Sequence, residues 1–276
     1  MAMNSVNTNV GAMIALQNLQ VTNSELTQVQ NRINTGKKVA SAKDNGAVWA
    51  IAQGQRAEIG ALNAVKDSLQ RGQSAVDVSL AAGESVSDLL VQLKEKALSA
   101  TDTSLTSSAR SALNEDFKSI RDQIATVVSN AAFNGVNLID GSSTGGFAAL
   151  ANVSGSTITV ASEDMSLSGS VVPLGASAVI DTASAATASL ALVSASIDNV
   201  GASLAKLGTG SNSLGTHLTF VGKLQDTLEA GVGNLVDADL AKESARLQAL
   251  QTKQQLGVQA LSIANSSTSI LLGLFR

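Results

Sequence analysis

The residue types best suited to acid–base, nucleophilic or metal chemistry are scarce in this sequence. Its 276 residues include one histidine, His217, and no cysteine or tyrosine. A catalytic triad would have to use His217 as its base, and a zinc site with four cysteine or histidine ligands is impossible. The adjacent Gly145 and Gly146 lack the spacing and the lysine of a phosphate-binding loop. The sequence therefore predicts no catalytic residue, no metal site and no cofactor, and His217 is interpreted as a structural or surface side chain.

Charge and composition exclude further classes of protein. The net charge is −4 and charged residues make up 14%, which indicates neither a nucleic-acid surface nor a disordered chain. No stretch reaches the roughly 18 uninterrupted apolar residues of a membrane span. The first residues lack the basic and apolar regions of a secretory signal, which leaves export by another route open. The mean hydropathy of +0.20 is high for a soluble monomer and favours a surface that assembly buries.

The elements with the clearest pattern are the two ends of the chain. In both, apolar residues alternate at spacings of three and four, the seven-residue repeat of coiled-coil helices. A helix over about residues 9–34 has its seam at Ala12, Leu16, Leu19, Leu26 and Ile33, with Asn23 and Gln30 at the remaining positions. The last helix has its seam at Leu240, Leu247, Leu250, Gly257, Leu261, Ala264, Leu271 and Phe275. We expect these helices to pair with each other or with neighbouring copies.

The last helix also carries a second apolar seam. It consists of Leu256, Ala260, Ile263, Ile270 and Leu274. A helix with two apolar seams is buried on two sides, and one partner helix covers only one of them. The helix is therefore either an ordinary core helix or a helix buried between the subunits of a polymer. The second interpretation is favoured because little of the chain is left to enclose it.

The middle of the chain predicts helices on both sides of a small β region. Ser41 to Asp44 have the spacing of a capping box that would start a second helix. Breaks are expected around residues 100–108 and at Phe133-Asn134-Gly135. Alternation predicts a strand at residues 156–160, and residues 165–167 are a second candidate. Helix returns after Asp181, with a joint near Gly231 and Gly233. The predicted fold class is mainly α, a long antiparallel helical rod with terminal coiled-coil helices and a small β-rich insertion.

Three separated stretches of the sequence resemble bacterial flagellin, the subunit of the flagellar filament. Residues 33–47 resemble the spoke-like segment between the terminal domain and the rod of that family. Residues 133–141 resemble the turn from the rod helices to the β region, and residues 237–243 and 271–276 resemble the start and end of the C-terminal helix. Three such motifs, in the order in which flagellins carry them, make the resemblance specific to this family. The short middle and the ending Phe275-Arg276 are similar to the short alphaproteobacterial, Caulobacter-like flagellins.

The resemblance implies a secreted, extracellular subunit that polymerises into a helical filament for motility, with the outer domains of longer flagellins nearly absent. It implies a terminal inner-tube domain (residues 1–40 plus 236–276), a helical rod (41–140 plus 181–235) and an outer-surface insertion (141–180). Arg32, Lys43 and Asp44 would lie at the domain joint, where Arg32 and Asp44 either form a polar lock or remain solvated. The expected assembly interface is Leu16, Leu19, Leu26, Ile33, Leu247, Leu250, Leu256, Leu261, Ile263, Ile270, Leu271, Leu274 and Phe275.

The resemblance also implies partners. The chain would form a homopolymer with itself and with paralogous flagellins, and would meet hook–filament junction and filament cap proteins. The type III flagellar export apparatus and a secretion chaperone would handle the unfolded chain, which has no cysteine to crosslink on the way. Neither nucleic acid nor membrane is expected as a partner. The ends of free subunits would be disordered until neighbouring copies bury them.

Two groups of surface residues take a candidate role from the resemblance. Gln92, Lys94 and Lys96 lie where other family members present a patch to a vertebrate innate receptor. Those members have Arg at the position of Gln92 and Leu at that of Lys96, which predicts escape from the receptor. A dense set of hydroxyls is either a soluble loop surface or the acceptor of O-linked nonulosonic sugars: Ser154, Ser156, Thr157, Thr159, Ser162, Ser166, Ser168 and Ser170.

Three other classes of protein compete with this interpretation. A hook–filament junction protein shares similar terminal helices but usually departs further from the motifs at Lys43-Asp44 and Phe133-Asn134-Gly135. A helical adaptor would stay monomeric and have ordered ends. An enzyme is disfavoured by the inventory of residues described above.

Overall fold

The computed structural model describes residues 8–273 and, among these, the side chains of residues 8–266. The chain divides into two compact units. The first is formed by Met1–Ala57 and Thr227–Arg276, and the second by Glu58–Asp226. The mainly helical fold class predicted from the sequence is confirmed, because helices α1 to α5 account for most of the described residues.

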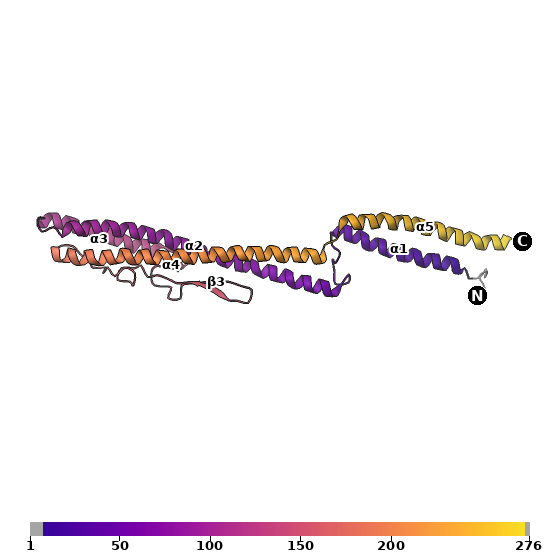
Figure 1. Cartoon of the computed structure of the whole chain (residues 1–276), viewed down its shortest axis with the longest axis horizontal. Helices are drawn as coiled ribbons and strands as arrows, with labels where there is room; N and C mark the ends of the chain where they lie inside the picture. The colour runs from indigo at the N-terminus through magenta and orange to yellow at the C-terminus, as the bar shows by residue number, and fades with distance from the viewer. Residues whose placement is uncertain (1–7, 274–276) are drawn as a thin grey trace. The chain divides into compact units, whose positions relative to one another are not determined.

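The first unit is built on the paired helices α1 (Val10–Thr35) and α5 (Leu240–Gly273), which run side by side in opposite directions (Figure 1). The side chain of Asn9 caps α1 by accepting a hydrogen bond of 2.9 Å from the N–H of Ala12. Gly36, at φ 67°, ends the helix in the left-handed conformation that glycine adopts without strain. Asp239 caps α5 by accepting from the N–H of Lys242. The helix predicted over residues 9–34 is therefore confirmed.

The connection between the helices of the first unit is held by main-chain hydrogen bonds. The N–H groups of Lys38 and Val39 both donate to the carbonyl oxygen of Val236, and the N–H of Ala238 donates to that of Gly36. These bonds tie the segment after α1 to the end of α4 (Ala183–Val236). The joint expected near Gly231 and Gly233 was wrong. Because these glycines keep their helical hydrogen bonds, α4 continues to Val236, and the break falls at residues 237–239.

The expected capping box at residues 41–44 was also wrong. Helix α2 (Gly46–Ala100) begins two residues later, where the side chain of Asn45 accepts from the N–H of Val48 at 3.1 Å. The carboxylate of Asp44 instead turns back and accepts hydrogen bonds from the N–H groups of Ala40 and Ser41. The short Asp side chain closes this loop and leaves the capping of α2 to the next residue.

The second unit packs parts of α2 and α4 with α3 (Ser107–Asn130). The turn expected around residues 100–108 is confirmed between α2 and α3. Arg110 holds it by donating to the carbonyl oxygen of Ala100, at the end of α2, and to that of Asp102 in the turn. The core column of α4 repeats every seven residues and is buried throughout: Val193, Val200, Leu207, Leu214 and Val221. This column forms the buried side of α4.

Two small hairpins follow α3. Strands β1 (Ala132–Phe133) and β2 (Val136–Asn137) are joined by Asn134 and Gly135, both at positive φ, so the expected tight turn is confirmed. Strands β3 (Phe147–Leu150) and β4 (Thr157–Val160) pair antiparallel, with Phe147 opposite Val160. β4 confirms the strand predicted at residues 156–160. The second candidate at residues 165–167 was wrong, because Leu167 makes only an isolated bridge to Val172.

A second column of α4 receives this β region. At seven-residue intervals it carries small or polar residues that are buried or half-buried: Ser189, Ser196, Ser203, Gly210 and His217. The hydroxyl of Ser189 donates to the carbonyl of Val179, and that of Ser203 donates to Glu163. A Cβ on Gly210 would lie 2.7 Å from a methyl group of Val160, so only glycine allows this close approach. The insertion is thus a packed layer on the helices.

Helix α4 is long and apolar enough to cross a membrane, and within the described part of the chain it is the one helix that meets this criterion. The criterion considers length and composition alone, and helices from the cores of proteins outside membranes also meet it. In this structure, α4 instead uses its two columns to pack against α2, α3 and the insertion.

Candidate assembly surface

The buried seam between α1 and α5 has a defined position on each helix. On α1 the least exposed side chains are Thr22 and Val29, with exposed fractions of 2% and 1%. They lie on a column with the half-buried Ala12, Ala15, Leu19, Leu26 and Ile33. On α5 the corresponding column is Glu243, Leu247, Leu250, Gln254, Gly257, Leu261 and Ala264, all buried or half-buried. Both columns alternate at spacings of three and four, as coiled-coil helices do.

The seam predicted for α1 was partly misplaced. It included Leu16, Asn23 and Gln30, but the positions that face α5 are Ala15, Thr22 and Val29. Leu16 is 47% exposed. Smaller side chains at positions 15 and 22 let the helices approach closely, and a Cβ on Gly257 would lie 3.2 Å from a methyl group of Leu19. Leu16 is consequently left open on one side of the pair.

The second seam of α5 is open to solvent within this single chain. Leu256 is 60% exposed and Ile263 is 70% exposed, and Ala260 between them is also exposed. On α1, Val10, Met13, Ile14 and Val21 are exposed as well. Apolar side chains gathered in this number on a helix pair indicate a surface that binds another protein.

A groove of about 390 Å³ lies between the two helices on the side of this second seam. It is lined by Ala15, Asn18, Leu19 and Thr22 of α1 and by Lys253, Leu256, Gly257 and Ala260 of α5. The groove has the size and apolar character to receive a side chain from another helix.

Four of the predicted assembly residues lie outside what the structure describes. The side chains of Ile270 and Leu271 belong to the undescribed part of α5, and Leu274 and Phe275 lie beyond residue 273. The remaining predicted residues divide into two groups. Leu19, Leu26, Ile33, Leu247, Leu250 and Leu261 lie in the seam between α1 and α5, and Leu16, Leu256 and Ile263 are exposed.

The three residues expected at the joint have different surroundings. Arg32 pairs with Glu243 instead of Asp44, with 3.1 Å between its Nη1 and the Oε1 of Glu243. Asp44 bonds to Ala40 and Ser41, and Lys43 is exposed. The N–H of Ser41 is the main cause that holds the pKa of the Asp44 carboxyl below its ordinary value of 3.8, and the charge of Arg32 adds a smaller effect. Glu243 was not predicted as a partner, although its place on the seam of α5 was a signal.

The candidate glycosylation residues differ in accessibility. Ser162 and Ser166 are half-buried, and their hydroxyls donate short hydrogen bonds of 2.5 Å to the carbonyl of Ser143 and to Asp164. The other six candidates are exposed: Ser154, Ser156, Thr157, Thr159, Ser168 and Ser170. Thr157 and Thr159 are on β4, and Ser154 and Ser156 are in the turn before it. In the predicted receptor patch, Gln92 and Lys94 are exposed, and Lys96 is half-buried with an ion pair to Asp116 at 3.0 Å.

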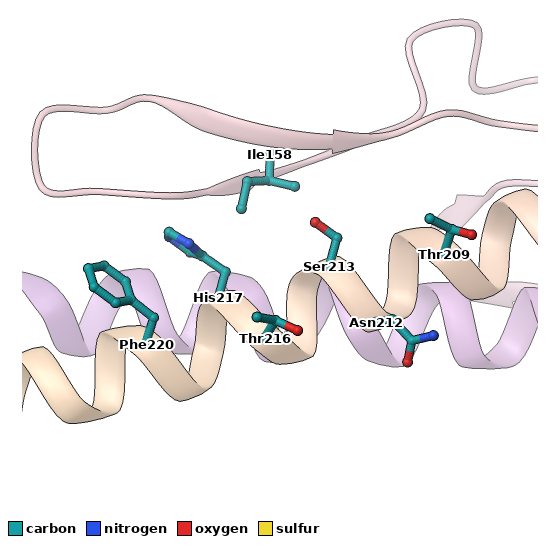
Figure 2. Close-up of a pocket in the computed structure, with 7 residues that line it drawn as sticks. All are labelled: Ile158, Thr209, Asn212, Ser213, Thr216, His217 and Phe220. Carbon is teal, nitrogen blue, oxygen red and sulfur yellow. The ribbon is translucent and has the colours of Figure 1, made fainter.

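His217 lines a shallow groove of about 470 Å³ between α4 and the β3–β4 hairpin. Figure 2 shows its ring below Ile158, with the ring of Phe220 one helical turn away. Its Nε2 lies 2.6 Å from the carbonyl oxygen of Ala151, which can only accept, so Nε2 carries the proton and donates. The other lining residues are Thr209, Asn212, Ser213 and Thr216. With no carboxylate in this lining and its Nε2 bound to the main chain, His217 lies in the surroundings of a structural side chain.

Comparison with known proteins identifies relatives along the whole chain. Residues 6–144 match the bacterial flagellin N-terminal helical region, and residues 190–275 match the C-terminal helical region. The chain is 60% identical to flagellin FljM and 61% identical to flagellin FljK of Caulobacter vibrioides, over the full length of both chains in each case. It is 39% identical to a flagellin of Brucella melitensis over 99% of this chain and all of that one.

Two solved structures share the fold. A putative flagellar hook-associated protein from Vibrio parahaemolyticus superposes with a TM-score of 0.56 at 17% identity, over 70% of this chain and all of that one. A flagellin of Bacillus cereus superposes with a TM-score of 0.50 at 20% identity, over 56% of this chain and 88% of that one. At these identities the likeness concerns the arrangement of the helices.

Proposed function

Because the chain belongs to the bacterial flagellin family, we propose that its terminal helices drive polymerisation by burying their open apolar faces against neighbouring copies. The chain is a structural subunit of the extracellular flagellar filament that serves bacterial motility. It polymerises with itself and associates with paralogous flagellins.

The observation that carries the proposal is the open second seam of α5, at Leu256, Ala260 and Ile263. Fully covering a Leu or Ile side chain contributes about 1.5–3 kcal/mol, whereas ordering the backbone costs about 1–2 kcal/mol per residue. Helices α1 and α5 cover each other along one seam only. Their ordering is therefore favourable when neighbours cover the second seam, and the ends of free subunits are disordered.

The predicted interface residues divide into two roles under this proposal. The seam residues Leu19, Leu26, Ile33, Leu247, Leu250 and Leu261 hold α1 against α5, and the exposed Leu16, Leu256 and Ile263 contact other copies. Ile270, Leu271, Leu274 and Phe275 extend these contacts toward the C-terminus. In the filament, residues 1–40 plus 236–276 form the inner tube, residues 41–140 plus 181–235 form the rod, and residues 141–180 face outward.

The family membership supports further partners for the assembly pathway. The chain passes through the type III flagellar export apparatus with a secretion chaperone, and its filament lies between junction proteins at the hook and a cap protein at the tip. The six exposed hydroxyl residues are the preferred acceptors of O-linked sugars, and an intact mass equal to that of the bare sequence would reject glycosylation. Gln92, Lys94 and Lys96 weaken recognition by the innate receptor, which strong signalling by purified monomer at low dose would contradict.

Seeded polymerisation tests the proposal directly. Heat-dissociated protein is mixed with short filament seeds and growth is followed by electron microscopy. The variant Leu256→Ser/Ile263→Ser and a chain cut after Asp237 are expected not to elongate the seeds. The matched control Gln255→Ser/Gln259→Ser changes exposed polar residues of the same helix and is expected to elongate them like the natural chain. Normal growth of the Leu256 and Ile263 variant would overturn the assignment of this face.

A hook–filament junction protein is the second candidate within the same structural class. The observation in its favour is the fold shared with the hook-associated protein from Vibrio parahaemolyticus, and the high identity to the Caulobacter flagellins weighs against it. The abundance of the chain in sheared filaments distinguishes the two roles. A filament subunit makes up bulk protein, and a junction protein is a trace component.

A further inference from the structure

Three polar contacts connect α1 and α5 along nearly the whole length of α1. Near its start, Asn9 Nδ2 donates to the carbonyl oxygen of Ala264 at 2.8 Å. In its middle, Gln254 Nε2 donates to Asn23 Oδ1 at 2.7 Å. Near its end, Arg32 Nη1 binds Glu243 Oε1 at 3.1 Å. We call these three contacts the polar ties. Glu243 and Gln254 belong to the seam column of α5, in which the other side chains are small or apolar.

The polar ties agree on one alignment of the two helices. In an antiparallel pair, the numbers of facing residues add to a nearly constant value. The ties give 273 for Asn9 with Ala264, 277 for Asn23 with Gln254, and 275 for Arg32 with Glu243. The apolar contact of Leu19 with Gly257 gives 276. All four contacts therefore belong to the same register.

The apolar seam does not specify this register by itself. Its residues repeat every seven positions, so a slip of one heptad, about 10 Å along the axis, again places apolar residues opposite apolar residues. Small residues leave room for both the native and the slipped register, namely Ala12 and Ala15 on α1 and Gly257 and Ala264 on α5. A repetitive seam of this kind is typical of helices that can pair in several registers.

The polar ties make the slipped registers costly. A slip of α5 by seven residues in one direction places Glu243 opposite Glu25, two carboxylates of like charge. A slip in the other direction places Arg32 opposite Leu250 and moves Glu243 past the end of α1 at Thr35. In both cases the charged groups lose their partner in a half-buried contact, which is strongly unfavourable.

We propose that the polar ties, together with the main-chain hydrogen bonds that join Gly36, Lys38 and Val39 to Val236 and Ala238, specify the register in which α1 and α5 pair, with the ties acting along the length of the helices at some cost to the stability of the pair. Arg32 and Glu243 retain side-chain exposures of 21% and 11% and share one hydrogen bond. Arg32 Nε and Glu243 Oε2 are buried without a hydrogen-bond partner in the part of the chain whose side chains are described. A charged pair in which each partner keeps one buried polar atom without a hydrogen bond adds little to stability. Apolar residues of similar size would pack at least as well.

The register decides what the helix pair presents to other copies. A one-heptad slip would move Leu256 and Ile263 by about 10 Å relative to the exposed residues of α1. The surface that the exposed apolar residues of α1 and α5 form together, with the groove at Leu19 and Gly257, would then no longer exist. The residues that form the polar ties are thus positioning residues for assembly. They act through the alignment of the two helices and do not need to contact the neighbouring copy.

Engineered cysteine pairs can report the register, because the natural chain has no cysteine that would interfere. The native reporter is Ala12→Cys/Ala264→Cys, whose numbers add to 276. The slipped reporter is Ala12→Cys/Gly257→Cys, one heptad away. Each is placed in the natural chain and in an apolar variant carrying Arg32→Leu/Glu243→Leu with Asn23→Leu/Gln254→Leu. Subunits are grown onto natural seeds and oxidised, and intramolecular crosslinks are separated from intermolecular ones on non-reducing gels.

The natural chain is expected to crosslink through the native reporter, with slipped product lower by about tenfold or more. The apolar variant is expected to raise the slipped product at least about tenfold. A control with equal added hydrophobicity away from the seam, Gln20→Leu/Gln28→Leu/Gln251→Leu/Gln255→Leu, is expected to behave like the natural chain. A slipped product that stays at the natural level, or that rises equally in the control, overturns the proposal.

A smaller variant and a second sample keep the test decisive if the fourfold variant does not grow on seeds. Asn23→Leu/Gln254→Leu removes one tie and leaves both charges paired, and it is expected to raise the slipped product by a smaller factor. The same oxidation of free chains, whose ends are disordered under the proposed function, gives the level of crosslinking without helix pairing. If the smaller variant grown on seeds shows no slipped product above the control, the polar ties do not specify the register.

Discussion

The Nε2 atom of His217 lies 2.6 Å from the carbonyl oxygen of Ala151, and this hydrogen bond fastens the β3–β4 hairpin to α4 near the hairpin turn. The single histidine of the chain therefore supports a strand connection. It extends a column of contacts that also includes Ser203 with Glu163 and Gly210 with Val160.

Replacing His217 with Ala is expected to loosen the hairpin locally. The net value of one such hydrogen bond is about 1 kcal/mol, so amide hydrogen exchange in β3 and β4 should accelerate about fivefold. His217→Gln keeps an N–H donor and should recover part of the protection. Thr216→Ala, at an exposed neighbouring position, should leave exchange unchanged. Equal protection in the His217→Ala variant would show that the bond contributes nothing.

Gly72→Ala is expected to destabilise the second unit even though alanine favours helices. A Cβ at position 72 would lie 2.8 Å from the ring of Phe147, and overpacking of this kind costs about 1–3 kcal/mol. Gly60→Ala in the same helix is the matched control, since no atom lies within 4 Å of its Cβ position. That change should stabilise by up to about 1 kcal/mol through helix propensity. Thermal unfolding followed by circular dichroism measures both, and a shift of the same sign in both would contradict the packing argument.

The loop closed by Asp44 is expected to weaken only in strong acid. Hydrogen bonds led by that of the Ser41 N–H hold the pKa of Asp44 below 3.8, so the ionised carboxylate is favoured in the folded loop. Its contribution is complete above the unfolded pKa and is lost as the pH falls through the lower folded pKa. The amide resonance of Ser41, followed by NMR from about pH 5 to pH 2, should move in this acidic window. In Asp44→Asn this titration should disappear, and its persistence would assign it to another group.

Removing one member of the Arg32–Glu243 pair should harm assembly more than removing both. Glu243→Ala leaves the half-buried guanidinium of Arg32 without its partner, at a cost of about 2 kcal/mol after allowance for its partial exposure. The monomer concentration that supports seeded growth should then rise about thirtyfold. Arg32→Leu/Glu243→Leu should raise it much less. If the double variant is as defective as the single one, the cost does not come from an unpaired charge.

Much of the fold could be predicted because particular residues have strong local preferences. Asn9 and Gly36 end α1 through a cap and a left-handed turn, and Asn134-Gly135 forces a tight hairpin, and each effect acts within a few residues. Strand β3 was missed because Phe147-Ala-Ala-Leu150 shows no alternation, and only pairing with β4 makes it a strand. The family motifs identified the flagellin family, which the comparisons establish.

The surface of the helix pair could be predicted less completely. Columns 12-16-19-23 and 12-15-19-22 differ by one residue at every second position, so the spacing rule fits both. What decides between them is the close approach of α5 at Gly257, a tertiary effect that no window of sequence contains. The second column of α4, on which the β region packs, was missed for a related reason. Ser189, Ser203 and His217 are polar and suggest solvent, although their recurrence at multiples of seven was a usable signal.

Five of the contacts that hold the insertion share one property, which is that helix side chains bind its main chain. Ser189 binds the carbonyl of Val179, Asn199 that of Val171, Arg121 that of Ala178 and His217 that of Ala151, and Asn114 accepts from the N–H of Ile180. Every amino acid except proline offers both a main-chain N–H and a main-chain carbonyl. At these five points the helices recognise the path of the chain and not its side chains, whereas Val160, Phe147 and Glu163 are held through their side chains. With the insertion on the outside of the filament, as proposed above, paralogues that exchange its exposed side chains would change the chemistry of the filament's surface while the same main-chain contacts continue to hold it.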